Sequence, residues 1–401
     1  MTDTDDTLPL AGIRVLDLTA IVLGPLATLC LADFGADVVK VEGPAGDGIR
    51  NSGAVTVAGM SSIYLALNRN KRSLALDLKK PGAQEVLHRL AEWADVVVHN
   101  LRPRSARDLG LDPETLRALN PRLVYCSASG FAEGSARAEE PAVDDVIQAT
   151  SGMADLFART GGSPRYAPAI MADKVCGLIL CQAILAGLLR RERTGQGMSV
   201  NVPMAETMTA FNLVEHMGAA TFGGSGETGY GRLMTPHRRP IATRDGYIAM
   251  TPYTKRDWQG FLRAAGYPDL AESARVTDPV LRNTEVGMLY AQLGEILKTR
   301  DTAEWIDIAR AVGIPVAAVR SLDEALEDPA VRDLGFVVEY PHPEVGPIRG
   351  PGSLVKITGE PDAPPRPAPP LGRDTAAVLA GIGFSEAEID GLLASGVALA
   401  G

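Results

Sequence analysis

The chain has 401 residues, of which 46% are hydrophobic, and a formal net charge of −10. This length and apolar content allow a large buried core and more than one domain. The acidic balance, with both signs interspersed along the chain, argues against a nucleic-acid partner, because phosphate binding needs clustered Lys and Arg.

Cysteine spacing and the N-terminus bear on the compartment. The cysteines show no paired short spacing, so neither a zinc knuckle nor a disulfide framework is indicated; they are Cys30, Cys126, Cys176 and Cys181. The start "MTDTDDTLPLAG" lacks the pattern of a signal peptide. The longest apolar run, 175–189, is shorter than a membrane span and contains Gln182. The sequence therefore predicts a soluble, cytoplasmic protein with no membrane partner and no metal.

The first 130 residues alternate between strand and helix patterns. Apolar, β-branched runs predict strands, and "PGAQEVLHRLAEWA" between them has helical spacing. The predicted strands cover 13–19, 36–42, 94–100 and 122–130. Such runs, apolar on both faces and separated by helices, predict an α/β fold with a parallel sheet. The turn after the first strand holds only Gly24, so a nicotinamide cofactor is not expected.

A second region begins near residue 220 with the glycine-rich stretch "TFGGSGETGYGRLM", either a mobile flap or a linker. The segments "DGYIAMTPYTKRDWQGFLRAAG" and "DTAEWIDIARAVGIPVAAV" then predict a smaller α/β domain. From about residue 330 the pattern returns to loops and short strands. It ends with helices at 374–383 and 385–396, for which Asp374 and Ser385 are the predicted caps.

Two acidic positions precede apolar helical patterns. Asp173 lies at the start of the long apolar helix predicted within 168–195. It is either an N-cap or an ionised carboxylate, stabilised by the helix dipole, that acts as a nucleophile. Asp144 and Asp145 precede a segment that contains Gln148. Two neighbouring acids before a helix are usually caps and solvated surface, so their spacing alone is a weak signal of function.

Six ordered blocks together resemble the class III CoA-transferase family, which includes formyl-CoA:oxalate and carnitine CoA-transferases and the related α-methylacyl-CoA racemases. The blocks are "GIRVLDLTAIVLGPLATLCLADFGADVVKVEGPAGDGIR", "LNRNKRSLALDLKKPGAQEVLHRLAEWADVVVHNLRP", "GLDPETLRALNPRLVYCSASGF", "VDDVIQATSGM", "MADKVCGLILCQAILAGLLRRERTGQGMSVNVPMAETM" and "PPLGRDTAAVL". The resemblance implies a Rossmann-like large domain built from 1–220 and 326–401, with a smaller domain, 221–325, inserted between them. It also implies an interlocked homodimer.

The resemblance places the family's catalytic aspartate at Asp173, in the block "MADKVCG". In such transferases this carboxylate attacks an acyl-CoA thioester to give a mixed anhydride, and the CoA thiolate then returns to give an aspartyl-CoA thioester. An incoming carboxylic acid repeats the two steps in reverse and leaves as the new acyl-CoA. Asp144, four residues before Gln148, matches a second family acid that could steer the nucleophile or the incoming acid.

Two other functions remain open at this point. The racemases of the family carry a His immediately before the second acid, where this sequence has Val143. A valine cannot exchange a proton, which argues against an acyl-CoA racemase or isomerase. A non-catalytic acyl-CoA-binding dimer is the other alternative, although such a homologue would be expected to have lost Asp173.

The resemblance also implies where coenzyme A binds, as a substrate and not as a permanently bound cofactor. The family's contacts fall on Ile21, Val22, Leu23, Leu76, Lys79, Asn100 and Leu101. Basic side chains that could pair with the CoA phosphates, or lie on ordinary solvated surface, are Arg72, Lys79, Arg102 and Arg104. Asp108 stands where the family often has a basic residue, so Arg104 or Arg107 could replace that contact.

The second region supplies the predicted flap and substrate residues. By resemblance, a glycine-rich loop closes over the reacting centre, and it corresponds to Gly223, Gly224, Gly226, Gly229 and Gly231. His237, Arg238 and Arg239 follow this loop, and one arginine could hold a distal carboxylate, which would favour a dicarboxylic acid beside the acyl-CoA. The alternative is a charged hairpin end. His216 is a further pocket candidate or a structural histidine.

Overall fold

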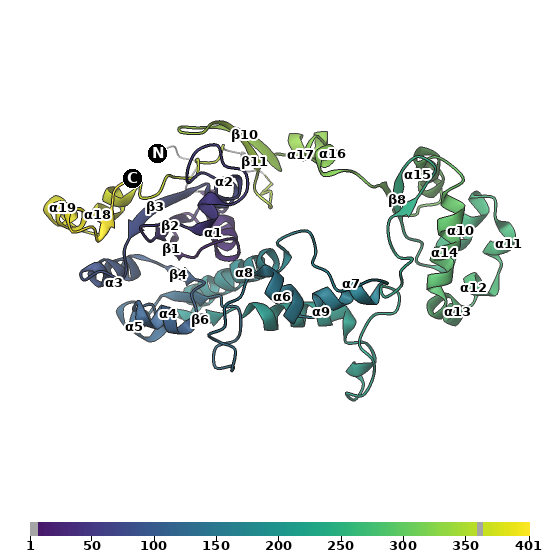
Figure 1. Ribbon diagram of the computed structural model, residues 1–401, viewed down its shortest axis with the longest axis horizontal. Coiled ribbons are helices and arrows are strands. Elements are labelled where there is room, and N and C mark those ends of the chain that lie inside the picture. Colours follow the sequence, from purple (N-terminus) through teal and green to yellow (C-terminus); the bar gives the residue numbers. More distant parts are fainter. Residues whose placement is uncertain (1–6, 359–363) are drawn as a thin grey trace. The chain divides into compact units, whose positions relative to one another are not determined.

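A computed structural model describes residues 7–358 and 364–401. Contacts divide the chain into two units (Figure 1). The first unit comprises the described residues of 1–151, 167–210 and 329–401, and the second comprises 152–166 and 211–328. The predicted domains 1–220, 221–325 and 326–401 remain a prediction, and the contact division adds that 152–166 groups with the second unit.

The first unit contains a seven-stranded sheet in the order β12-β3-β2-β1-β4-β5-β6. All neighbours pair in parallel except β12, which is antiparallel to β3. The strands are β1 (Arg14–Leu18), β2 (Asp37–Glu42), β3 (Lys71–Leu76), β4 (Val96–His99), β5 (Val124–Ser127), β6 (Met198–Asn201) and β12 (Ala398–Leu399). The parallel sheet confirms the predicted α/β class; β3 and β6 were not predicted as strands.

The helices of the first unit follow these strands, as expected for parallel connections. They are α1 (Leu23–Asp33), the 3₁₀ helix η2 (Gly48–Asn51), α2 (Ser62–Asn68), α3 (Ala83–Trp93), α4 (Pro103–Asp108), α5 (Pro113–Leu119), α6 (Asp144–Thr150), α8 (Met171–Thr194), α17 (Pro329–Asp333), α18 (Thr375–Gly381) and α19 (Glu386–Ala394). α9 (Met204–His216) begins in this unit, and a hairpin of β10 (Val337–His342) and β11 (Gly346–Pro351) belongs to it.

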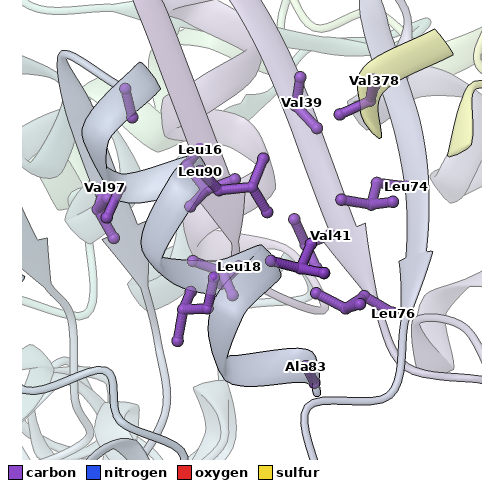
Figure 2. Packing of buried hydrophobic residues seen from close by; sticks show 14 of the residues in the cluster. Leu16, Leu18, Val39, Val41, Leu74, Leu76, Ala83, Leu90, Val97 and Val378 are labelled. Atoms are coloured by element: carbon purple, nitrogen blue, oxygen red, sulfur yellow. The ribbon is translucent and has the colours of Figure 1, made fainter. Parts of the chain in front are cut away.

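One core covers a face of the sheet, and it joins both ends of the chain (Figure 2). Leu16, Val39 and Leu74 from neighbouring strands meet Leu90 of α3, and Val378 of α18 packs against the same cluster. Burying each such side chain contributes roughly 1.5–3 kcal/mol. The C-terminal segment is therefore held on the first sheet both by this core and by the β12–β3 pairing.

The two predicted C-terminal helix caps have different outcomes. Ser385 caps α19, because its hydroxyl accepts the Glu388 N–H in a capping box. Asp374 precedes α18, but its side chain makes no cap bond to that helix. Its carboxylate instead accepts the Ser73 N–H at 2.9 Å, a contact with β3 that local sequence does not reveal.

Helix α8 is longer than its apolar run suggests. In the described part of the chain it is the one helix whose length and composition would let it cross a membrane, contrary to the expectation that no segment is long enough. Half of its most apolar window is nevertheless buried inside the protein, where α8 packs against α1, α6 and β5. A core helix of a globular protein passes the same test, so these criteria do not assign α8 to a membrane.

The second unit has a small antiparallel sheet covered by helices. The strands, in the order β7-β8-β9, are β7 (Ile241–Ala242), β8 (Tyr247–Met250) and β9 (Val316–Ala318). The helices are α7 (Met153–Arg159), η3 (Gly218–Thr221), α10 (Lys255–Ala264), α11 (Pro268–Ala271), α12 (Ala274–Thr277), α13 (Pro279–Thr284), α14 (Val286–Leu297), α15 (Thr302–Ala311) and α16 (Leu322–Leu326). Trp258, Phe261 and Trp305 are central in a core of its own.

Candidate active site

The strand order of the first sheet reverses between β1 and β4, and open parallel sheets bind ligands outside the carboxyl ends of their strands at such a point. Here the turn after β1 meets Asn100, which follows β4. The Asn100 side chain accepts the Ala20 N–H at 2.9 Å and donates to the Ala20 carbonyl at 2.8 Å. Two segments predicted to contact CoA are thus brought together.

Asp173 lies in the first turn of α8 and is buried, with 7% of its surface exposed. The N-cap position belongs to Ile170, so Asp173 is not the cap of this helix. Burial and the negative charge of Asp144 raise the pKa of Asp173 to about 6, while a hydrogen bond from the Leu23 backbone N–H lowers it. Near neutral pH the carboxylate is therefore ionised but poorly solvated, which suits a nucleophile.

Asp144 fixes the start of α8. One carboxylate oxygen accepts the Asp173 backbone N–H at 3.0 Å, and the other accepts the Gln148 amide at 2.5 Å. Gln148 in turn accepts the Ala167 N–H at 2.9 Å, which holds the segment that leads into α8. Asp144 thus satisfies one of the free N–H groups at the helix start. The structure brings the two predicted acids together.

Two glycines allow the close packing around Asp173. A Cβ atom on Gly177, one turn after Asp173, would lie 2.6 Å from the Leu23 carbonyl oxygen. A Cβ atom on Gly24 would lie 2.2 Å from the Cβ of Thr19. Glycine at position 177 therefore lets α8 approach the N-terminal end of α1, where the Leu23 amide acts on the Asp173 carboxylate, and glycine at position 24 lets the start of α1 pack against Thr19.

A buried ionic network contacts the turn between β1 and α1, and it was not predicted from the sequence. The Lys71 ammonium contacts Asp17 at 3.1 Å, and the Lys40 ammonium contacts Asp47 at 3.0 Å. Burial raises the pKa of Asp17, but Lys71 and Lys40 outweigh it and hold that pKa at about 2. Burial lowers the pKa of Lys71 to about 8. The signal in the sequence was a charged residue inside a strand that is otherwise apolar on both faces.

Three of the remaining predicted CoA residues, Leu76, Lys79 and Leu101, lie at or just after the carboxyl ends of β3 and β4. Lys79 is exposed and lines a cavity of about 600 Å³, together with Leu78, Lys80, Pro81, Gln84, Ser105, Asp108 and Leu109. Leu76 is buried in the core, which leaves its backbone for any ligand contact. The Leu101 N–H is bound to the ring of His99, a buried histidine whose desolvation lowers its pKa to about 4.

The predicted arginines are mostly engaged within the protein. Arg72, at the amino end of β3, forms a two-pronged ion pair with Asp37, with distances of 2.9 and 2.5 Å. Arg72 therefore lies at the amino end of its strand, whereas the turn between β1 and α1 follows a carboxyl end. Arg102 donates to the Glu139 carbonyl, and Arg104, 80% exposed, lies 3.9 Å from Asp108. Arg107 pairs with Glu133 and Glu139.

The predicted flap and substrate residues belong to the second unit. Gly223 and Gly224 are exposed and left-handed, with φ of 107° and 81°. The three predicted substrate residues are also exposed, namely His237, Arg238 and Arg239. His216 is buried, and its Nδ1 accepts the Tyr230 N–H at 3.1 Å, which gives it a structural partner.

Between 7–358 and 364–401 there is no group of three or more His, Cys, Asp or Glu side chains arranged to hold a metal ion. All four cysteines are free thiols.

Comparison with known proteins decides the family. A family model described as CoA-transferase family III matches residues 10–375. The chain belongs to CoA-transferase family III. The succinyl-CoA:glutarate CoA-transferase of Mus musculus is 31% identical over 98% of this chain and 91% of its own length. Formyl-CoA:oxalate CoA-transferase of Escherichia coli O157:H7 is 30% identical over 95% of this chain and 97% of its own length. This family III protein is therefore an enzyme, a CoA-transferase.

A third relative also has a solved structure. Rv3272 of Mycobacterium tuberculosis, named a probable fatty acyl-CoA transferase, is 31% identical over 93% of this chain and 98% of its own length. The crystal structure of an aspartate-to-alanine variant of Rv3272 matches this family III protein with a TM-score of 0.80, over 93% of this chain and 99% of that one. The similarity extends along almost the whole chain.

Proposed function

We propose that this CoA-transferase moves CoA from an acyl-CoA thioester to a free carboxylic acid, with Asp173 as the covalent nucleophile. The observation that carries the proposal is the environment of Asp173, which is buried at the start of α8 with a pKa of about 6 and a backbone N–H at its carboxylate. An ionised, poorly solvated carboxylate is reactive, and a fixed amide orients it.

Each step conserves an activated carbonyl. A carboxylate oxygen of Asp173 bonds to the acyl carbon, the carbon–sulfur bond breaks, and CoA leaves as a thiolate. The thiolate then attacks the Asp173 carbonyl, which releases the first acid and gives an aspartyl-CoA thioester. An incoming carboxylate attacks this thioester to give a second anhydride, and the thiolate opens that anhydride to form the new acyl-CoA, which regenerates Asp173.

The acceptor that we propose is a dicarboxylic acid. Two relatives are named for dicarboxylates, namely glutarate and oxalate. The exposed Arg238 and Arg239 offer the planar donor groups that bind a carboxylate with two hydrogen bonds. The name of Rv3272 favours a longer acyl chain instead, so the donors to be tested include both classes.

We also propose an interlocked homodimer in the cytoplasm, with a Rossmann-like large domain of 1–220 and 326–401 and a small domain of 221–325. The strand order from β3 to β6 supports the Rossmann-like large domain.

The exposed leucines of α8 support the dimer. Leu178 and Leu189 are 47% and 63% exposed, as expected for surface that a second subunit covers. Sedimentation should give twice the mass of the chain; a monomer at assay concentration would contradict the dimer.

A racemase is not favoured. Val143, at the position where the resembling racemases carry His, is 64% exposed and has no group that transfers a proton. No exchange of the α-proton of a 2-methylacyl-CoA with deuterated water is therefore expected.

Intact-protein mass spectrometry tests the proposed function. The enzyme is mixed with succinyl-CoA, glutaryl-CoA, formyl-CoA and a long-chain acyl-CoA, and its mass is measured before and after hydroxylamine. At least one donor should give a hydroxylamine-sensitive adduct in the wild type and in Asp145→Ala, whose acid is exposed on α6, but not in Asp173→Ala. CoA binding with neither adduct nor turnover would favour the non-catalytic alternative.

A further inference from the structure

The turn between β1 and α1 contains a strained residue. Ile21 has a φ of 71°, in the left-handed region that β-branched residues avoid. Among the described residues, the other non-glycine residue with positive φ is Asn70, a type that tolerates this conformation better. A conformation of this kind persists only where its surroundings impose it, and such sites cluster where a protein binds or reacts.

Side chains from two neighbouring strand ends impose the turn. Asp47, from the loop after β2, accepts the Ile21 N–H with both carboxylate oxygens, at 3.0 and 3.2 Å. Asn100, after β4, binds both the N–H and the carbonyl of Ala20. Consecutive backbone groups of the turn are therefore anchored from both sides of β1.

Asp47 is itself rigidly held. It is 5% exposed, and the fully buried Lys40 donates both to Asp47 at 3.0 Å and to the Thr19 carbonyl at 2.8 Å. The Asp47 carboxylate also accepts the Ile49 N–H at 3.1 Å, while its backbone N–H donates to Glu42 at 2.8 Å. A carboxylate bound on so many sides can fix an unfavourable backbone conformation.

The turn leads directly to Asp173. α1 begins at Leu23, and its N-cap residue Val22 makes no side-chain cap bond, so the first amides of this helix lack the usual local acceptor. The Leu23 backbone N–H instead acts on the Asp173 carboxyl group and lowers its pKa. Gly177 removes the Cβ that would collide with the Leu23 carbonyl. The position of residue 23 relative to the nucleophile thus depends on the conformation of residue 21.

We propose that Asp47 and Asn100 are positioning residues of this transferase, which hold Ile21 in its left-handed conformation and thereby keep the Leu23 amide on the Asp173 carboxyl group. The proposal rests on the proposed function of Asp173. When the CoA thiolate attacks the Asp173 carbonyl, negative charge develops on a carboxyl oxygen, and a fixed backbone N–H at this group stabilises it. Asn100, predicted as a CoA contact, acts on the turn with its side chain.

A double-mutant cycle with Ile21→Gly tests this role. Asp47→Asn and Asn100→Ala should each lower kcat/KM about 10- to 100-fold, because the strained turn relaxes. Glycine adopts positive φ without strain, so in the Ile21→Gly background the same two changes should each cost less than about 5-fold. Loss of the Leu23 amide should also move the acid limb of the kcat/KM profile to higher pH in Asp47→Asn.

Asp33→Asn is the matched control. Asp33 forms another buried ion pair, with Arg69, near the far end of α1, so its removal tests loss of a buried charge without disturbing the turn. This variant should lower stability but leave the acid limb in place and show no rescue by Ile21→Gly. If Asp47→Asn fails to fold, Asn100→Ala carries the test, because it leaves no buried charge unpaired.

Equal losses with Ile21 intact and in the Ile21→Gly background would overturn the proposal, as would a crystal structure of Asn100→Ala in which residue 21 keeps its left-handed conformation. If the wild type forms the Asp173 adduct and these variants show no rescue, the positioning role alone fails. If the wild type forms no adduct, the proposed function fails, and the Asn100→Ala crystal structure still decides whether the side chain holds the turn.

Discussion

The surroundings of Asp173 and the segment 223–239 of the second unit are held in opposite ways. Asp173 is buried, its backbone N–H is bound to Asp144, and the Leu23 amide lowers the pKa of its carboxyl group. The neighbouring turn contacts a network of buried charges. The segment 223–239 carries left-handed glycines and exposed basic side chains. The difference suggests that the proposed chemistry depends on a rigidly held Asp173 in the first unit. The choice of substrate would depend instead on the exposed side chains of the segment 223–239.

The pH dependence of activity should show the largest effect of the buried environment of Asp173. The proposed nucleophile Asp173 must be ionised to react, and its pKa is about 6. We expect kcat/KM to fall about tenfold per pH unit below pH 6, which makes about 100-fold at pH 4. Initial rates across pH 4–8 measure it. An acid limb near pH 4 would show that the carboxylate is solvated in the free enzyme and not held in a poorly solvated site.

The free energy of unfolding should also reflect the burial of the Asp173 carboxylate. The folded pKa of about 6 exceeds the ordinary value of 3.8, so the folded state retains the proton more readily, and the free energy of unfolding falls as pH rises between about 4 and 6. The neutral Asp173→Asn should therefore be about 2–3 kcal/mol more stable than the wild type at pH 7 and equal to it below pH 4.

Urea denaturation at both pH values measures this difference. Asp145→Asn, at an exposed position, serves as the control and should shift stability little. A wild type that is as stable as Asp173→Asn at pH 7 would mean that the carboxylate is not destabilised by burial.

Packing around the nucleophile gives a third test. Gly177→Ala should lower kcat about tenfold and destabilise by roughly 1–3 kcal/mol, because the new Cβ would lie 2.6 Å from the Leu23 carbonyl and push α1 from α8. Gly391→Ala, in α19 with open space around it, should stabilise slightly. Steady-state kinetics and thermal melts measure both variants; wild-type kcat for Gly177→Ala would show that this contact does not position the site.

The smallest effect is expected for the exposed arginines of the second unit. If Arg238 or Arg239 binds the distal carboxylate, its replacement by Met should raise KM for glutarate about 5- to 20-fold and leave KM for a monocarboxylic acid unchanged. Arg244→Met, also exposed in the second unit but paired with Asp301, should change neither value. Equal changes for both acid classes would remove the dicarboxylate role.

The sequence allowed prediction of what depends on local pattern. Alternating apolar strands and helices predicted the parallel sheet, and the resemblance singled out Asp173 and Asp144, which the structure places in contact. β3 was not predicted; it begins with the charged residues Lys71 and Arg72, and the Lys71 side chain is fully buried against Asp17.

The supporting contacts of the turn could not be predicted for a different reason. Asp47 resembles an ordinary residue of a Gly-rich loop, and only the tertiary structure brings it to Ile21. The left-handed conformation of Ile21 is likewise invisible in the sequence, since isoleucine predicts extended backbone. In the same way, the two-pronged pairing of Arg72 with Asp37 joins two strands that lie far apart along the chain.

Peptide mapping of the covalent intermediate tests whether Asp173 is the nucleophile. The enzyme is quenched during turnover with hydroxylamine, digested, and the modified acid is located by tandem mass spectrometry. We expect a hydroxamate on Asp173 that also forms in Asp145→Ala and is absent without acyl-CoA. A hydroxamate on Asp144 or another acid, or rapid turnover with an unmodified Asp173 peptide, would contradict it.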